Sequence, residues 1–412
     1  MTTGDIALEE RQGINFLRLW YVLIAIMIAI GLWGAYNVLR YGLVVTNLSD
    51  QVPWGLWITH DLSAIGLGAG AFAFSAIAYL FRFTQFKEIS RAAVYIGFIG
   101  YTSAMIALAM DIGRPDRFYY PLIYWNVHSV LWEITWCVVL YSTILFFEFL
   151  PILLEHSFFD RWPGIRRIGH SVHSLTPVFA VLGLGLSLLH QSSLGATYGV
   201  LSGREIWYKP TLPVMFIISA VAAGTALTLF LTILAGKFMD QELISDDLKM
   251  RVARFSGYTM LLYLYLKLWD YAATTYYSHS PGTADAMLRL QLTTPYSRTF
   301  WVFEVLLGAL IPAIIFLYPP LRRNDRMLII GLGLAVVGLV VNRWNVTLSG
   351  LVVPPVWTPG VLGNILVYTY LPSLVETAVT IGIIGYGFLM FTLGVRHLPL
   401  YPKSEGEEEE AH

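Results

Sequence analysis

Long apolar runs alternate with short polar segments along almost the whole chain. A helix needs about 20 mainly apolar residues to cross a bilayer. Runs of that kind lie at 17–42, 54–82, 91–112, 127–154, 172–194, 211–236, 252–276, 297–318, 327–349 and 369–395. Irregular backbone cannot face lipid, so these runs predict helices. The pattern indicates an all-α polytopic membrane protein, with a ten-helix bundle over 17–395 between an N-terminal segment, 1–16, and an acidic tail, 396–412.

The composition agrees with this class of protein and sets its orientation. The chain is 56% hydrophobic and 13% charged, whereas soluble domains carry roughly 25% charge. The side that holds both termini has roughly twice as many lysines and arginines as the other, which predicts cytoplasmic termini. The single cysteine, Cys137, excludes iron–sulfur ligation by this chain and an intrachain disulfide.

Ionisable residues inside the predicted helices gather toward one side of the membrane. Such residues are costly in a bilayer, about 2.5–3.5 kcal/mol at a helix centre on insertion scales, and they signal function. In the outer halves of the helices lie His60, Asp61, Asp111, Glu133, His190, Lys267, Asp270, Glu304, Arg343 and Glu376. A channel should be polar along its whole length. A one-sided layer instead favours a cofactor or substrate site in the outer leaflet.

Some of these residues have a purely structural interpretation. Lys267 and Asp270 are three residues apart on one helix and can pair with each other. Arg343 can form a buried ion pair with Glu304 or Glu376. Three glycines on the second predicted helix indicate close helix packing, and no nucleotide fingerprint: Gly66, Gly68 and Gly70.

Other residues are better candidates for chemistry. His60 is followed by Asp61, and a histidine beside a carboxylate is a natural proton relay. His190 and Gln191 begin a run of four hydrogen-bonding side chains at the predicted end of a helix, which can line a ligand wall. Glu148 is the clearest ionisable residue in the inner half, where it either reaches the interface or belongs to a proton path.

Three segments together resemble a known family. They are PWGLWITHDLSAIGLGAG (53–70), DIGRP (111–115) followed by WNVHSVLWE (125–133), and LHQSSLG (189–195). They are similar to the NrfD/PsrC family of quinone-reactive membrane subunits, in particular those of hydrogenase-2 and of the menaquinone reductase complex of sulfate-reducing bacteria. The similarity extends thinly to FWVFEVLL (300–307) and RNDRMLI (323–329).

The resemblance implies a quinone site near the outer face of a helical bundle that binds no haem, metal or iron–sulfur cluster itself. It also implies a [4Fe-4S] partner subunit on the periplasmic side of a bacterial inner membrane. A multihaem cytochrome c and a molybdopterin-oxidoreductase-like subunit are further partners that it leaves open, beside membrane lipid and without nucleic acid. The positions matching the family motifs are Asp61, Asp111, Arg114, Asn126, Ser129, Glu133, His190 and Gln191. His60 and His128 depart from the hydrogenase-2 pattern, so their roles stay open.

We therefore expect a quinone-reactive anchor subunit of a respiratory oxidoreductase, active as a menaquinone reductase only with electron-transfer partners. Proton transfer is assigned to Asp61, Asp111, Glu133 and His60, with proton uptake through Glu148. Quinone contacts are assigned to His190, Gln191, Asn126, Ser129, His128 and Arg114. Arg114 is also expected to orient Asp111 or to stabilise a quinone anion.

Two other classes of protein remain as alternatives. A subunit that oxidises quinol through b-type haems needs facing histidine pairs, and only His60, His173 and His190 are suitably placed. A secondary transporter or ion channel should show an inverted repeat or a polar lane through the inner leaflet, and the sequence shows neither.

Overall fold

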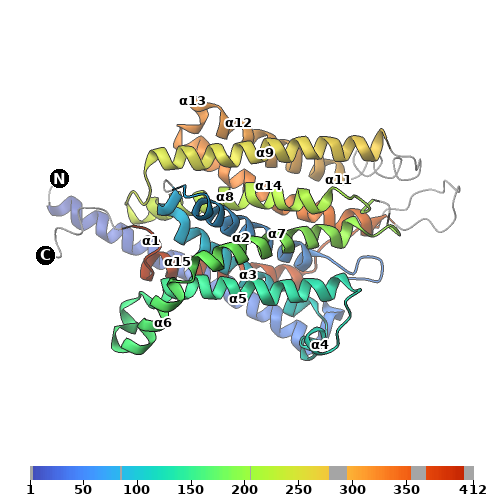
Figure 1. Cartoon of the computed structure of the whole chain (residues 1–412), viewed down its shortest axis with the longest axis horizontal. Coiled ribbons are helices and arrows are strands. Elements are labelled where there is room, and N and C mark those ends of the chain that lie inside the picture. The colour runs from blue at the N-terminus through green and yellow to red at the C-terminus, as the bar shows by residue number, and fades with distance from the viewer. Residues whose placement is uncertain (1–2, 84–85, 205, 278–294, 354–367, 403–412) are drawn as a thin grey trace.

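Helices make up every regular element in the described part of the chain. The computed structural model describes residues 3–83, 86–204, 206–277, 295–353 and 368–402 (Figure 1). The long helices are α1 (Thr3–Tyr41), α2 (Leu56–Leu80), α3 (Lys87–Asp111), α5 (Val130–Leu154), α7 (Thr176–Gly199), α8 (Leu212–Met239), α9 (Asp246–Thr275), α14 (Asp325–Val352) and α15 (Leu374–His397). A further rod is formed by α11 (Pro295–Arg298), η5 (Thr299–Leu310) and α12 (Ile311–Leu317), and shorter elements are η1 (Gly42–Val45), η3 (Pro115–Arg117), α4 (Tyr120–Ile123), η4 (Ser157–Arg161), α6 (Pro163–His173) and α13 (Pro319–Arg322).

Within the described residues, nine of the ten predicted spans are long enough and apolar enough to cross a membrane. The remaining one, α9, is 30 residues long and runs beside α8 and α12 through the bundle (Figure 1). Its tyrosines and charged side chains lower its hydropathy below that of the others. The chain is thus an all-α, multi-pass membrane protein, as the sequence predicts.

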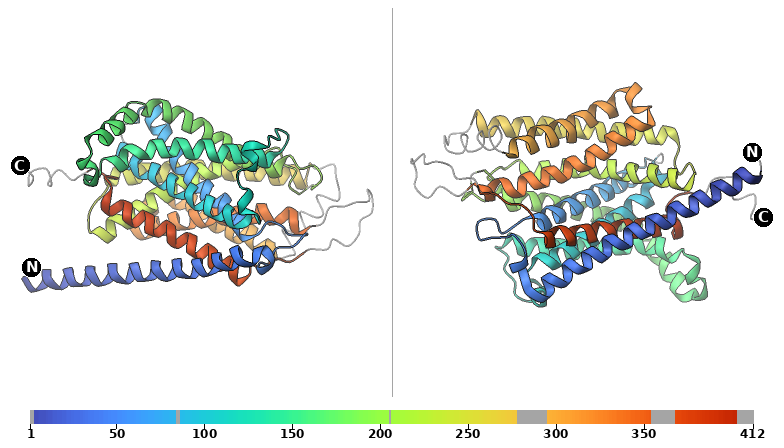
Figure 2. Two further views of the ribbon diagram at one scale, coloured as in Figure 1. Left: turned by 90° about the horizontal axis from the view of Figure 1, so that it is seen from below. Right: turned by 180° about the vertical axis from the view of Figure 1, so that it is seen from behind.

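Successive long helices run in opposite directions, which gives the bundle two different ends. The start of α1 and the end of α15 lie together at one of them (Figures 1 and 2). We call this the turn end; its connections are 81–83, 155–175, 240–245 and 318–324. We call the opposite end the loop end; its described connections are 42–55, 112–129, 200–204, 206–211 and 368–373.

The long helices pack as two groups of four and a pair. The first bundle consists of α2, α3, α5 and α7, which contact one another in a ring. The second bundle consists of α8, α9, the η5–α12 rod and α14, again in a ring. The remaining helices, α1 and α15, pair with each other and pack against α3 (Figure 2).

Glycines join the two bundles where α2 meets α8. A Cβ atom on Gly70 would overlap the carbonyl oxygen of Ala220, and one on Gly224 would overlap the backbone nitrogen of Ala71. The helices therefore touch backbone to backbone, as the small residues predict. On the neighbouring face of α2, Gly68 lies against Gly97 and Gly100 of α3.

Several helix ends differ from the predicted ones. The first helix begins at Thr3, well before the apolar run that starts at 17. The connection between α5 and α7 contains α6, which hydrophobic run length could not reveal because the helix is short and amphipathic. Pro163 and Pro177 open α6 and α7, where a missing N–H costs no helical hydrogen bond. The end of α7 falls at Gly199, so His190 lies inside the helix.

Candidate functional site

A group of polar side chains lies in the loop-end half of the first bundle. We call it the first polar cluster: His60, Asp61, Tyr101, Asp111, Glu133, His190, Gln191 and Ser193. All four helices of the ring contribute to it. The sequence placed six of these residues in its candidate site, and the fold brings them to the same end of one bundle.

His190 is the most enclosed member of the first polar cluster. Its side chain is 0% exposed, and Nδ1 forms a hydrogen bond of 2.8 Å with the hydroxyl of Tyr101 on α3. The other ring nitrogen, Nε2, is buried without a hydrogen-bond partner among the residues that the structure describes. The next residue, Gln191, is 2% exposed, and neither the nitrogen nor the oxygen of its side-chain amide has a partner within the described part of the chain. Buried polar atoms are nearly always paired in folded proteins, so these atoms are candidates for hydrogen bonds with water or with a polar ligand group.

Asp61 and Asp111 bring carboxyl groups to the same region. Asp61 is 4% exposed, and Asp111, the last residue of α3, lies close enough to interact with it electrostatically. One carboxyl oxygen of each is buried and has no hydrogen-bond partner in the segments that the structure describes. His60, one residue before Asp61, also has its Nε2 buried and unpaired. Carboxyl and imidazole groups enclosed together are those that membrane proteins use to carry protons.

Glu133 connects α5 to the loop-end half of α7. Its Oε1 accepts a hydrogen bond of 2.6 Å from the Ser193 hydroxyl. Glu133 lies in the first turn of α5, where the helix dipole favours a negative charge. Ser129 caps that helix, because its hydroxyl accepts from the backbone N–H of Trp132. Ser129 thus has a structural role that positions Glu133.

The remaining predicted site residues lie on the exposed loop between α3 and α5. Asn126 and His128 are both exposed. Arg114 pairs with Asp116 through a fork of two hydrogen bonds, 2.9 and 2.8 Å, so the prediction that it orients Asp111 is wrong. Gly113, with a φ of +68°, turns the chain away from α3 just before Arg114. The hydrogen bond from Arg114 lowers the pKa of the Asp116 carboxyl.

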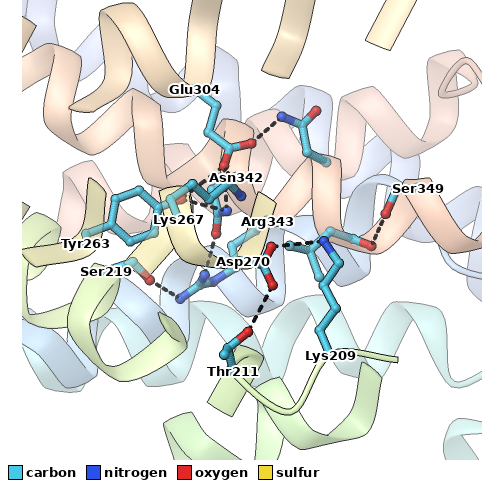
Figure 3. A network of polar contacts seen from close by, with 12 residues as sticks. Lys209, Thr211, Ser219, Tyr263, Lys267, Asp270, Glu304, Asn342, Arg343 and Ser349 are labelled. Atoms are coloured by element: carbon cyan, nitrogen blue, oxygen red, sulfur yellow. Dashed lines mark hydrogen bonds and ion pairs between the residues drawn. The ribbon is translucent and has the colours of Figure 1, made fainter. Parts of the chain in front are cut away.

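A second polar cluster lies in the loop-end half of the second bundle (Figure 3). Its centre is Glu304, which is 1% exposed and whose Oε1 lies 2.6 Å from Nζ of Lys267. The same oxygen accepts hydrogen bonds from Tyr263 and Asn342, both 3.0 Å, while Oε2 accepts from Asn345. The buried charge of Glu304 is therefore compensated by four side chains.

Asp270 also has its partners on another part of the chain. Nζ of Lys209 lies 3.0 Å from Oδ2, and the Thr211 hydroxyl donates to Oδ1 at 2.9 Å (Figure 3). The predicted pair of Lys267 with Asp270 is thus wrong. Instead, both residues line a cavity of about 50 Å³ with their respective partners.

Arg343 forms no ion pair with a carboxylate of the described residues, contrary to the sequence prediction, although it interacts with Glu304 at longer range. Its guanidinium donates to the side-chain oxygens of Asn342 at 2.6 Å and Ser219 at 3.1 Å. It also lies over the ring of Phe216, 3.7 Å from the ring centre. This cation–π contact replaces part of the lost hydration. Arg343 is 1% exposed and faces Gly66 of α2, so it lies between the two bundles.

Glu376, the other predicted partner of Arg343, caps helix α15. It forms a capping box with Ser373, in which each side chain accepts from the other's backbone N–H. Its carboxylate also accepts from the backbone N–H of Asn47, at 2.9 Å, and from the hydroxyl of Tyr370. These helix-capping contacts explain why the Glu376 side chain is buried.

Glu148 lies by a cavity near the turn end of the first bundle. The cavity has a volume of about 120 Å³ and is also lined by Arg91, Glu155 and His173. Arg91 and Glu155 form a two-pronged pair with distances of 2.7 and 3.0 Å. One oxygen of Glu148 is buried without a partner. The cavity brings a carboxyl group and other polar side chains together on the side opposite the first polar cluster.

Tyr101 was missed by the sequence analysis, as were Asn342 and Asn345. A tyrosine in an apolar helix is typical of a core residue, and its partner His190 is 89 positions away. The two asparagines carried a usable signal, because they interrupt an apolar membrane helix.

The fold and its one-sided polar clusters define a polytopic helical membrane protein with enclosed polar sites. The family model described as "Polysulphide reductase, NrfD" matches residues 44–355, and the chain belongs to that family. This confirms the resemblance found in the sequence.

Relatives within this family cover nearly the whole chain. The chain is 33% identical to the menaquinone reductase integral membrane subunit of Nitratidesulfovibrio vulgaris, over 96% of this chain and 94% of that protein. It is 28% identical to the Hdr-like menaquinol oxidoreductase integral membrane subunit of Archaeoglobus fulgidus, over 94% and 95%. It is 27% identical to the probable Ni/Fe-hydrogenase 2 b-type cytochrome subunit of Escherichia coli, over 89% and 88%.

Proposed function

We propose that the chain is the quinone-reactive membrane subunit of a respiratory oxidoreductase complex, and that menaquinone is its quinone. The observation that carries this proposal is the pair His190 and Gln191, whose buried Nε2 and side-chain amide atoms have no partner among the described residues and belong to the same polar cluster as the carboxyl groups of Asp61 and Asp111. A quinone head carries two carbonyl oxygens that need donors, and protons must reach those same oxygens. Two of the relatives are named for menaquinone or menaquinol, which favours that quinone.

His190 and Gln191 bind the quinone head in this proposal, with His60 as a further donor. Asp61, Asp111 and Glu133 transfer the protons. Reduction of one quinone to quinol consumes two electrons and two protons, so every electron must be matched by a proton at the carbonyl oxygens. The protein binds and orients the quinone head and transfers protons to it, while the quinone itself accepts the electrons.

The electrons come from a partner subunit in this proposal. With a single cysteine in its sequence, the chain has too few thiolates for an iron–sulfur cluster of its own. A [4Fe-4S] subunit would dock at the loop end, where the exposed residues Arg114, Asn126 and His128 lie. We place this end on the periplasmic side of a bacterial inner membrane, from the bias in lysine and arginine.

Protons reach the site from the turn end in this proposal, by way of Glu148. Its carboxyl group and the 120 Å³ cavity beside it support that role. Electrons arriving at the loop end and protons arriving at the turn end would move charge across the membrane, so turnover would be electrogenic.

Binding of a quinone analogue tests the proposal. The fluorescent inhibitor 2-heptyl-4-hydroxyquinoline N-oxide would be titrated into the full chain in nanodiscs, and quenching would give Kd. We expect His190→Ala and Asp61→Asn each to weaken binding at least tenfold. The controls His156→Ala and Asp246→Asn, both at the turn end, should leave Kd unchanged. Equal Kd values in all five proteins would contradict the proposal.

A b-type haem subunit is the competing function, since one relative is named a b-type cytochrome subunit. The buried Nε2 atoms of His60 and His190 are the groups that would serve as axial ligands. A reduced pyridine-haemochrome spectrum of the purified chain decides between the two functions. Haem bound in a fixed ratio, and lost in His190→Ala, would favour the cytochrome.

A further inference from the structure

Tyr101 contacts His190, another member of the first polar cluster, through its ring and through its hydroxyl group. The residue is 1% exposed, and its hydroxyl oxygen lies 2.8 Å from Nδ1 of His190. Among the residues that the structure describes, this nitrogen is the single hydrogen-bond partner of the hydroxyl. The Tyr101 ring is held by Tyr141, whose ring lies edge-on with the centroids 4.5 Å apart. The hydroxyl is thus fixed in place against the imidazole.

The direction of this hydrogen bond follows from what each atom can do. If Nδ1 of His190 donated, the hydroxyl hydrogen of Tyr101 would be buried without an acceptor, which is unfavourable. The hydroxyl therefore donates and Nδ1 accepts. A neutral imidazole has one donor and one acceptor nitrogen, so the hydrogen of His190 must be on Nε2. That is the atom that is buried without a partner.

We propose that Tyr101 is a positioning residue of the quinone site, which holds His190 as an Nε2–H donor directed at the ligand. This inference rests on the proposed function. A quinone carbonyl oxygen can only accept a hydrogen bond, so it fits an N–H donor. A quinol hydroxyl must also donate its own hydrogen, for which Nε2–H offers no acceptor. Through Tyr101, His190 favours the oxidised head over the reduced one.

Substitution of Tyr101 tests this role, and Tyr141 provides the matched control. Tyr141 is a second buried tyrosine of the same bundle, in contact with Tyr101, but its hydroxyl is not bonded to His190. In the nanodisc titration with 2-heptyl-4-hydroxyquinoline N-oxide, we expect Tyr101→Phe to raise Kd about tenfold. Tyr141→Phe should leave Kd within about twofold.

A second variant, His190→Gln, separates the positioning of the His190 ring from general damage to the fold. His190→Gln supplies an amide N–H whose orientation does not depend on the Tyr101 hydroxyl, so adding Tyr101→Phe should raise Kd less than twofold. Infrared difference spectra with ring-labelled histidine, taken against His190→Gln, should show the Nε2–H form in the native chain. The same spectra should show a mixture of tautomers in Tyr101→Phe.

The outcomes distinguish this inference from the proposed function. Equal effects of Tyr101→Phe and Tyr141→Phe would overturn the inference and leave the quinone site standing. So would a full effect of Tyr101→Phe in the His190→Gln background, or an unchanged tautomer signal. If the native chain does not bind the analogue, or His190→Ala binds it unchanged, the proposed function fails and the inference fails with it.

Discussion

Glu133 on α5 and Ser193 on α7 are joined by a hydrogen bond of 2.6 Å at the loop end of the first bundle. This contact connects the helix that carries His190 to a carboxyl group near the protein surface. Ser193 follows His190 by three residues on α7, so Glu133 is bonded to α7 less than one helix turn away from His190. The proposed site therefore has an enclosed side, at His190, and a partly exposed side, at Glu133.

Substitution of Glu133 should separate hydrogen bonding from proton transfer. Glu133→Gln keeps an oxygen that accepts from Ser193 but can no longer exchange a proton, so we expect kcat for quinone reduction to fall at least tenfold. KM should change less than threefold. The measurement is electron transfer from the reduced partner subunits to a menaquinone analogue in the purified complex, with the exposed Glu242→Gln as control. Turnover within twofold of the native complex would remove Glu133 from the proton path.

The ion pair of Lys267 with Glu304 should be important for stability. Removal of one partner leaves a buried charge uncompensated, so Lys267→Met should lower the free energy of unfolding by about 3–5 kcal/mol. The double variant Lys267→Met, Glu304→Leu should recover a large part of that loss. Unfolding in mixed micelles measures both. Asp246→Asn, which removes an exposed pair with Lys249, is the control and should cost less than about 1 kcal/mol.

The joint between the two bundles should not tolerate even one methyl group at Gly224. A Cβ atom there would overlap the α2 backbone, which is not free to move, so Gly224→Ala should lower the unfolding temperature by several degrees. Gly185 lies in α7 with nothing within 4 Å of its would-be Cβ. Gly185→Ala should therefore leave the unfolding temperature unchanged or raise it slightly. The same response in both variants would refute the close approach of α2 and α8.

Glu148 should determine whether protons cross from the turn end. In proteoliposomes that contain the complete complex, quinone reduction by the native protein should generate a membrane potential that a voltage-sensitive dye reports. Glu148→Gln should lower the rate and the potential together, at least fivefold, because an amide cannot carry a proton. Turnover of the native complex without any potential would exclude proton uptake from the turn end.

The sequence allowed the helices to be predicted well and their contacts poorly. Runs of about 20 apolar residues form helices in a bilayer, so the spans can be predicted to within a few residues. The i, i+3 spacing of Lys267 and Asp270 suggested a local pair, but the fold offered each a better partner. Glu304 is 37 positions from Lys267, and Lys209 is 61 positions from Asp270. Which charged residues form an ion pair depends on which helices become neighbours.

The candidate site could also be predicted only in part, because the sequence does not show which helices become neighbours. Asp61, Asp111, Glu133 and His190 stand out as ionisable groups in apolar helices, and they do converge on one end of one bundle. Tyr101 does not stand out, because a tyrosine is common in membrane helices. Only the packing of α3 against its neighbours in the ring shows that its hydroxyl meets His190.

A structure of the complete complex with menaquinone bound tests the central claim most directly. The account predicts the quinone head in the loop-end half of the first bundle, with a carbonyl oxygen within hydrogen-bonding distance of Nε2 of His190 or the amide of Gln191. Asp61 should lie on the same side of the head. A quinone head in the second bundle instead, in the cavity beside Lys267 and Glu304, would contradict the account.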